Sequence, residues 1–444
     1  MCKVRKGLRC RICMGCGLCP GVRAEALRVS GSPGGTEALH VLTDSDSIST
    51  RRAAPGGNAG NDWSWGGDVV PAGAHPEGSG QGIRLVTADV GTTTVAMLLH
   101  GAQGTVEDRY VALNPQAEYG ADVISRIRAA EDADQAKAMH GKIREVLEQG
   151  LKRFKKEIGA GESLQMVLAA NTTMTYLLMG WDTSELGRAP FRASRLQGAE
   201  TVIGDVPCFI FPGISAFVGG DIVAGMYACG MGSREEITLL IDLGTNGELV
   251  LGNRDRRMAC ATAAGPAFEG GANRGVWGAD MISRLAALKR EGLLDETGLL
   301  AEEYFERGIR VGNVHVTQKG VRAVQLAKAA VAAGIEVLLE KYGVRAEQVD
   351  RVVLAGGFGY YLKPEDAAEI GLLRPELAQK AVAGGNTALS GALLAGSRAD
   401  ILPGELKNLI RGTEALNLAE EPGFEKRYAE AINLQSPIDN LTRR

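Results

Sequence analysis

The sequence is poor in the residues that several functional classes require. It has five histidines in 444 residues, scattered at 40, 75, 100, 140 and 315, so no histidine-based triad or metal centre is indicated. Aromatic residues make up 5% and the net charge is −4, which argues against nucleic-acid binding. No apolar run reaches the length of about 18 residues that a membrane helix needs, and no apolar leader begins the chain. We expect a cytoplasmic protein without nucleic-acid or membrane partners.

Cysteine is also scarce along most of the chain. Three of the eight cysteines, Cys208, Cys229 and Cys260, stand singly in apolar surroundings, where a small buried side chain is the expected outcome. The other five lie within the first nineteen residues. This uneven distribution predicts a separate cysteine-rich head at residues 1–30.

The head carries a metal-binding pattern. Residues 10–20 read CRICMGCGLCP, three C-x2-C steps followed by proline. This run is similar to that of bacterial ferredoxins and fits an iron–sulfur cluster, [4Fe–4S] by its pattern, better than paired zinc knuckles, although zinc is the alternative. The fourth ligand stays open between Cys19, Cys2 and a cysteine of another subunit. The predicted metal ligands are Cys10, Cys13, Cys16 and Cys19.

Behind the head, composition divides the chain. Residues 31–82 are rich in glycine, serine, proline and aspartate and predict a flexible linker. A repeated construction follows: residues 83–100 read IRLVTADVGTTTVAMLLH and residues 236–253 read EITLLIDLGTNGELVLGN. Helical patterns at 120–133, 136–158 and 321–342 separate such strands, which indicates an α/β fold with two related lobes. We place the lobes at 83–235 and 236–436 and a tail at 437–444.

The repeated turns suit phosphate chemistry. Glycine lets a backbone approach phosphate oxygens closely, successive N–H groups form an anion-binding concavity, and threonine hydroxyls add donors. An aspartate ending each strand can hold Mg²⁺, usually through water. Two such loops facing each other would clamp a polyphosphate from both sides. The candidate magnesium residues are Asp89 and Asp242, and the candidate phosphate residues are Gly91, Thr92, Thr93, Thr94, Gly244, Thr245 and Asn246.

Three further stretches suit the same clamp. Residues 351–359, RVVLAGGFG, form a strand that opens into Gly356 and Gly357, a close-approach turn fitted to the nucleoside. Residues 217–230 place Asp221 at the start of a small-residue helix, where it serves either as a helix N-cap or to position the attacking water. Residues 384–396, GGNTALSGALLAG, form a second small-residue helix suited to close packing at a hinge.

In motif content and order, the chain resembles the actin, sugar-kinase and Hsp70 ATPase superfamily. DVGTTT and DLGTNG look like its two phosphate motifs, LAGGFG like its adenosine motif, and GGDIVAGM and GGNTALSGA like its connecting helices. The resemblance implies a two-lobed actin-like ATPase with ribonuclease-H-like lobes, here joined to a small N-terminal iron–sulfur head. It implies ATP and Mg²⁺ as ligands.

The blocks between these motifs narrow the resemblance. NPQAEYGADVISRI, NTTMTYLLMG, PGISAFVGGDIVAG, AAGPAFEGGAN and QLAKAAVAAGIEVLL resemble the reductive activators of corrinoid-dependent enzymes, over residues 84–436. That family implies an ATP-dependent iron–sulfur protein that returns a partner's cob(II)alamin to cob(I)alamin. The implied partners are a corrinoid protein or corrinoid-dependent methyltransferase and a low-potential electron donor. The tethered head is compatible with a homodimer.

The chain departs from that family at two places. Long members carry a [2Fe–2S] domain with other cysteine spacing and an additional domain before the ATPase, whereas this chain has the short head and linker. Gly320 stands where an acidic residue is expected. Two alternatives stay open: an ATP-dependent electron activator of a radical dehydratase or reductase, and a non-catalytic nucleotide-binding redox sensor.

Overall fold

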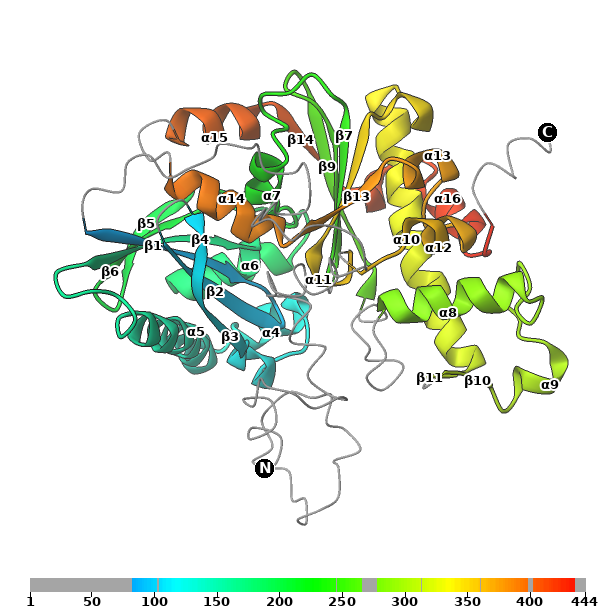
Figure 1. Cartoon of the computed structure of the whole chain (residues 1–444), viewed down its shortest axis with the longest axis horizontal. Helices are drawn as coiled ribbons and strands as arrows, with labels where there is room; N and C mark the ends of the chain where they lie inside the picture. The colour runs from blue at the N-terminus through cyan, green and yellow to red at the C-terminus, as the bar shows by residue number, and fades with distance from the viewer. Residues whose placement is uncertain are drawn as a thin grey trace, which may run out of the picture.

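The computed structural model describes residues 82–435, apart from 102–103, 245, 266–277, 313, 360 and 398–401. The cysteine-rich head with its four predicted ligands, nearly all of the linker, Thr245 and the tail lie outside the described residues. In the described part, the strands form two six-stranded sheets and one small ribbon, β10 (Ile309–Val311) with β11 (Val314–Val316). The two large sheets stand side by side in Figure 1.

The first sheet follows the order β3-β2-β1-β4-β6-β5. Its first three strands form an antiparallel meander, and β4 and β6 then run parallel to the central β1. The strands are β1 (Ile83–Val90), β2 (Thr94–His100), β3 (Val106–Leu113), β4 (Ser163–Ala170), β5 (Ala199–Ile203) and β6 (Val206–Ile210).

The second sheet repeats this plan in the order β13-β12-β7-β8-β9-β14. An antiparallel meander again begins at the central strand, β7, and parallel strands β12 and β13 lie on its other side. The predicted internal repeat and two-lobed α/β fold are therefore confirmed. The strands are β7 (Thr238–Leu243), β8 (Gly247–Gly252), β9 (Arg257–Thr262), β12 (Arg351–Ala355), β13 (Ala381–Gly385) and β14 (Thr413–Leu416).

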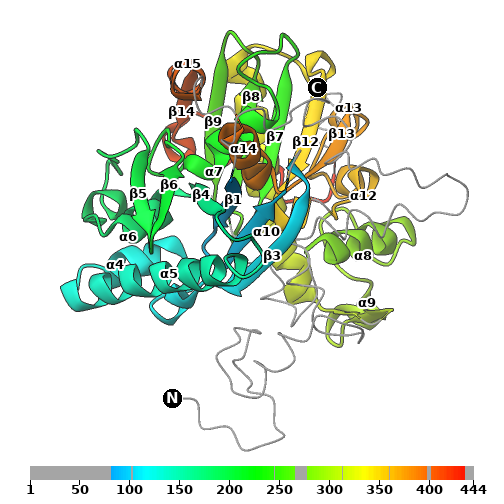
Figure 2. The same ribbon diagram turned by 60° about the vertical axis from the view of Figure 1, so that its left-hand side comes forward.

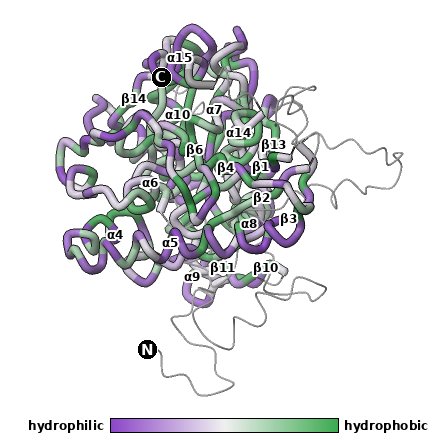
Figure 3. Tube along the Cα trace, turned by 90° about the vertical axis from the view of Figure 1, so that its left-hand side faces the viewer, coloured by the Kyte–Doolittle hydropathy of each residue, from purple (hydrophilic) through white to green (hydrophobic). Residues whose placement is uncertain are grey.

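Amphipathic helices cover the sheets. In α5 (Ala133–Phe154), the Asp132 side chain caps the first turn, and buried residues such as Met139, Ile143 and Leu147 recur at helical spacing toward the first sheet. The long α10 (Gln318–Tyr342) covers the second sheet, begins at its cap Thr317 and ends at left-handed Gly343. Figure 3 shows hydrophobic segments gathered in the interior and hydrophilic ones at the periphery.

The remaining helices are shorter. In the first lobe they are α4 (Val123–Ala129), α6 (Thr172–Met179), η2 (Pro115–Glu118) and η3 (Ser184–Gly187). Later in the chain they are α8 (Gly278–Arg290), α9 (Glu302–Phe305), α11 (Gly356–Gly359), α12 (Pro364–Glu369), α13 (Pro375–Ala378), α15 (Leu402–Arg411), α16 (Phe424–Glu430), η5 (Ala346–Gln348) and η6 (Leu418–Glu420). Across the described ranges, none of the helices has both the length and the apolar character to cross a bilayer.

Two small-residue helices lie between the sheets. α7 (Gly220–Ala228) and α14 (Thr387–Gly396) share one apolar core with strands of both lobes, including Val167, Leu240 and Val353. They cross so closely that a Cβ at Gly391 would overlap the carbonyl oxygen of Ala224. Figure 2 shows α14 and α7 in this central position. Glycine is required here because the two backbones touch.

We expect Gly391→Ala to lower the stability of the protein by about 2 kcal/mol or more, because the added methyl group forces the helices apart. Gly141→Ala is the matched control, since Gly141 is exposed within α5 with nothing within 4 Å of its Cβ position. That change should be stabilising by about 0.5–1 kcal/mol. Denaturant unfolding measures both, and similar midpoints for the two variants would contradict the close crossing.

Candidate nucleotide site

The first predicted phosphate loop is the hairpin turn between β1 and β2. Gly91 N donates to Thr94 O at 2.9 Å and closes the turn. Two asparagines hold it from outside: Asn114 Nδ2 donates to Gly91 O at 2.8 Å, and Asn171 Nδ2 to Thr92 Oγ1 at 3.2 Å. Thr92 and Thr94 are buried and Thr93 is partly exposed. Of the three predicted threonines, Thr93 is thus the most open to a ligand.

A buried arginine fixes the same loop. Arg126, in α4, has no exposed surface and donates to Thr92 O at 2.6 Å and to Gly120 O at 2.9 Å. Sequence reasoning did not single out this residue, because a lone arginine within a helical pattern resembles a solvated charge. The bond to Thr92 O ties the loop to α4, and the bond to Gly120 O holds the Arg126 side chain in place.

The second predicted loop is the equivalent turn between β7 and β8. Gly244 N donates to Asn246 O at 2.9 Å. On its far side the chain enters β8 at Gly247, whose carbonyl accepts from Thr262 Oγ1 at 3.0 Å. The sequence placed Gly244 and Asn246 correctly in a hairpin turn, and the sheets bring both hairpins into the region between the lobes.

Gly356 stands against the second loop. It follows β12, has φ +79°, and a Cβ there would lie 2.5 Å from both Asp242 Oδ1 and Leu243 O. A larger residue would displace the aspartate, so glycine is required by close approach as well as by conformation. Gly357 follows it in α11 and is buried. The close approach that the structure shows at Gly356 is to Asp242 and Leu243, and the expected contact of Gly356 and Gly357 with a nucleoside stays a prediction.

Four carboxylates gather where the lobes meet. Asp89 and Asp242 are the penultimate residues of β1 and β7, and Asp221 occupies the first turn of α7. The fourth is Glu248 of β8, which pairs directly with Asp242 across the hairpin. Each residue keeps part of its surface exposed, although its carboxyl group is largely surrounded by protein.

Burial and the charges of neighbouring carboxylates raise the pKa values of these groups. Burial raises the pKa of Asp89 to about 6 against the opposing hydrogen bond from Asn386. Burial and the charge of Asp89 raise the pKa of Asp221 to about 7. Burial, with the charges of Asp221 and Asp89, raises the pKa of Asp242 to about 8. Burial and two neighbouring aspartates raise the pKa of Glu248 well above its usual value. A bound cation would relieve this repulsion.

The arrangement favours a hydrated cation. Among the described residues, no three histidine, cysteine, aspartate or glutamate side chains converge closely enough to ligate a metal together. Mg²⁺ keeps several of its waters and is usually held through one or two carboxylates and the phosphates of a substrate. The carboxylate oxygens between the lobes are donors of the kind that magnesium takes.

The N-termini of α14 and α7 also lie at the site. Asn386 caps α14 and donates through Nδ2 to Asp89 Oδ2 at 2.7 Å, which joins the second lobe to the first. The residue that caps α7 is Gly219, so Asp221 is not the N-cap that the sequence left as one alternative. Asp221 Oδ1 instead accepts from Ile222 N at 2.8 Å.

Sequence reasoning did not identify Glu248 and Asn386 as site residues, although both lie within the motifs quoted above. Glu248 follows Asp242 by six residues in the DLGTNGE stretch, and counting the register of the hairpin places the two side by side. In the first hairpin the same register places Ala96 opposite Asp89. The equivalent position therefore carries a carboxylate in the second lobe and only a methyl group in the first.

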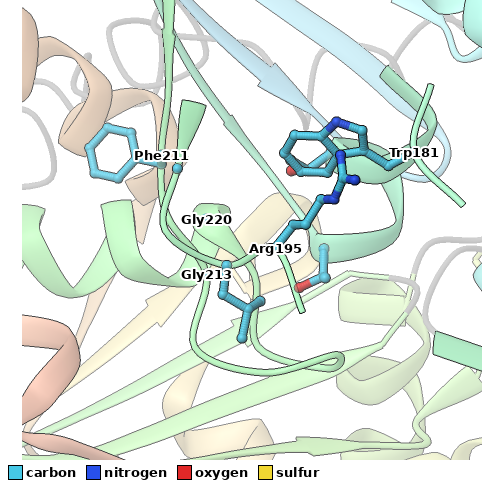
Figure 4. A pocket seen from close by; sticks show the side chains of 9 residues that line it. Trp181, Arg195, Phe211, Gly213 and Gly220 are labelled. Atoms are coloured by element: carbon cyan, nitrogen blue, oxygen red, sulfur yellow. The ribbon is translucent and has the colours of Figure 1, made fainter. Parts of the chain in front are cut away.

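A small pocket on the first lobe adjoins the site. It approaches the site through Thr172, next to Asn171, and Gly220, next to Asp221. The Arg195 guanidinium lies over the Trp181 ring at 5.0 Å from its centre, and Figure 4 shows this pair facing the segment with Gly213 and Gly220. The lining residues are Thr172, Thr175, Trp181, Arg195, Leu196, Gly198, Phe211, Gly213 and Gly220.

The described cysteines are core residues. Cys208, Cys229 and Cys260 are buried and free, as the sequence indicated. Burial raises the pKa of Cys229 to about 12 and raises the pKa of the other two thiols further. Since the thiolate is the form that binds metal, these three are poor cluster ligands.

We expect Glu248→Gln to stabilise the nucleotide-free protein, with a gain that grows between pH 5 and pH 8. The pKa of Glu248 is raised in the folded state, so the folded protein holds a proton that the unfolded chain releases, and stability falls as pH rises through this range. Glutamine imitates the protonated side chain at every pH. Thermal unfolding at the two pH values measures the effect.

Glu200→Gln is the matched control, because Glu200 is exposed on β5. It should give no pH-dependent gain. Equal gains for Glu248→Gln at pH 5 and pH 8 would show that burial and the neighbouring aspartates do not raise the pKa of this carboxylate.

Comparison with known proteins identifies relatives of this chain. Two family models match: the RACo middle region over residues 85–234, and the C-terminal domain of RACo, the ASKHA domain, over 236–275 and 271–442. The chain is 30% identical over 417 residues to the corrinoid activation enzyme RamQ of Eubacterium limosum, covering 77% of this chain and 69% of that protein.

Two further proteins are similar. The solved structure of a reductive activator for a corrinoid, iron–sulfur protein superposes with a TM-score of 0.70 at 30% identity, covering 81% of this chain and 67% of the other. A [Co(II) methylated amine-specific corrinoid protein] reductase of Methanosarcina barkeri is 24% identical over 299 residues. That match covers 54% of this chain and 55% of the reductase, about half of each.

Proposed function

The chain belongs to the family of reductive activators of corrinoid proteins, and we propose that it uses ATP hydrolysis to return a partner's cob(II)alamin to cob(I)alamin. The observation that carries the ATP part is the pair of matched hairpin loops with four carboxylates between them. The corrinoid belongs to the partner and is the substrate.

The described residues supply the nucleotide chemistry in this proposal. The turns at Gly91 and Gly244 present backbone N–H groups to phosphates, and Gly356 borders the nucleoside. Magnesium, held through water by Asp89 and Asp242, would neutralise phosphate charge. Asp221, in the first turn of α7 beside the other carboxylates, would orient the attacking water.

In this proposal, movement of the lobes couples ATP hydrolysis to the reduction of cobalt. Reduction of cob(II)alamin is uphill, and each 59 mV of unfavourable one-electron potential lowers the equilibrium constant about tenfold. A ligand shifts such an equilibrium only if it binds two states with different affinity. The Asn386–Asp89 hydrogen bond joins the lobes at the proposed nucleotide site, and movement of the lobes around ATP would change the surfaces offered to the partner.

Electron transfer is assigned to the N-terminal head. Cys10, Cys13, Cys16 and Cys19 would hold an iron–sulfur cluster, which would supply one-electron chemistry from a low-potential donor. The three described cysteines are buried thiols on separate elements, which disfavours a radical-dehydratase type of activator with cluster ligands in the ATPase body. The sensor alternative differs from our proposal in lacking turnover.

An anaerobic assay tests the proposal. The iron-reconstituted protein is mixed with a cob(II)alamin carrier, a low-potential reductant and ATP, and the visible absorption of cobalt is followed. We expect cob(I)alamin to appear only with ATP. ATP hydrolysis without cobalt reduction across several carriers would support the dehydratase type of activator, and neither activity would support the sensor.

Asp242→Asn should lower ATP hydrolysis by about 10- to 100-fold, the effect seen when a group that holds a metal indirectly is removed. It should lower ATP-dependent cobalt reduction in parallel. Glu200→Gln again serves as the control and should retain both activities. An Asp242→Asn variant with full hydrolysis would remove this aspartate from the magnesium site.

Cys13→Ser should separate the two activities. We expect ATP hydrolysis to continue while cobalt reduction and iron–sulfur absorption are lost, because the change is confined to the head. Cys208→Ser tests cysteine loss in general and should keep the iron–sulfur absorption. Cobalt reduction that survives Cys13→Ser would exclude the head as the electron carrier.

A further inference from the structure

A basic and aromatic surface projects from the first lobe beside the nucleotide site. Residues 188–195 read RAPFRASR, with Arg188, Arg192 and Arg195 all exposed, in a protein whose net charge is −4. The ring of Phe191 lies 5.4 Å from that of Phe217, which is 40% exposed. We name these five residues the arginine–aromatic ledge.

Hydrogen bonds to Glu185 and Tyr176 fix the backbone of the ledge. The Glu185 carboxylate accepts from Tyr176 Oη at 2.7 Å and from Ser194 N and Oγ at 2.8 Å. Tyr176 Oη in turn accepts from Arg195 N at 2.9 Å. Arg195 is steadied further by the Trp181 ring (Figure 4). A surface fixed before binding loses less conformational entropy when a partner docks.

The positive charge of the ledge is only partly compensated. Arg188 pairs with Glu131 at 3.1 Å, but both side chains are more than half exposed, so water screens the pair. Within the described ranges, Arg192 makes no ion pair, and Arg195 faces an aromatic ring. Arginine and exposed aromatic side chains are the residue types that dominate binding energy at protein interfaces.

Hydrogen bonds connect the ledge to the first phosphate loop. Ser215 Oγ accepts from Phe217 N at 3.2 Å, and Ser215 O accepts from Thr172 Oγ1 at 2.7 Å. Thr172 follows Asn171, whose side chain donates to Thr92 in the loop. A shift of the phosphate loop therefore reaches the backbone that carries Phe217.

We propose that the arginine–aromatic ledge docks an acidic face of the corrinoid-carrying partner, and that nucleotide bound at the first phosphate loop changes the affinity of this contact. The proposal rests on the proposed function, which supplies the class of partner. Exposed guanidinium groups select carboxylates, and the two phenylalanine rings add apolar contact that a free anion would not use.

The test measures binding of the full-length protein to purified corrinoid carriers in the cob(II) state, with and without a non-hydrolysable ATP analogue. Arg192→Glu should weaken binding about tenfold or more, because it places like charges together, and Phe217→Ser should also weaken it. Higher salt should reduce the wild-type affinity and narrow its difference from Arg192→Glu. Partner-independent ATP hydrolysis should not change.

Arg345→Glu is the matched control, since the Arg345 side chain is 81% exposed in the second lobe. It should bind carriers as the wild type does. If wild-type protein binds and reduces a carrier but both ledge variants behave like this control, the ledge proposal is wrong and the proposed function stands. If the wild type neither binds nor reduces any carrier, both fail. Equal affinity with and without the ATP analogue would disprove the nucleotide effect.

Discussion

The crossing of α7 and α14 is the contact on which the site depends. The first helix begins at Gly220 beside Asp221, and the second begins after Asn386, so both helices point their N-termini at the carboxylates between the lobes. Backbone touches backbone at Gly391 and Ala224. Interiors packed this closely shift between discrete arrangements and do not deform gradually. Movement of one lobe therefore has to displace a helix start at the site.

The fold also brings carboxylates that repel one another together at this site. Burial raises the pKa of Asp89, and burial together with neighbouring charges raises the pKa values of Asp221, Asp242 and Glu248. The sheets around them bury mainly apolar side chains. Such repulsion lowers the stability of the nucleotide-free protein. A cation bound between these carboxylates would offset their repulsion and so would stabilise the protein.

Sequence reasoning succeeded where a local pattern carries the structure. The two Asp-x-Gly-Thr turns, the helices around 136–158 and 321–342 and the turn at Gly356 each follow from a few consecutive residues, and the repeat of the hairpins gave the two-lobed fold. It missed Glu248, Arg126 and Asn386, because their roles come from register and tertiary contact. Glu248 joins the site because it pairs with Asp242 on the neighbouring strand. Arg126 acts on the loop because it donates to the carbonyl of Thr92, 34 residues earlier in the chain.

The Asn386–Asp89 hydrogen bond joins residues 297 positions apart. As the ribosome makes the chain from its N-terminus, the first hairpin exists long before its partner from the second lobe is synthesised. The first sheet has all its strands by Ile210, but α14, which packs on β1 and β4, arrives only after Thr387. The proposed nucleotide site is therefore completed late in synthesis, and a fragment released early would contain only the first of its two hairpin loops.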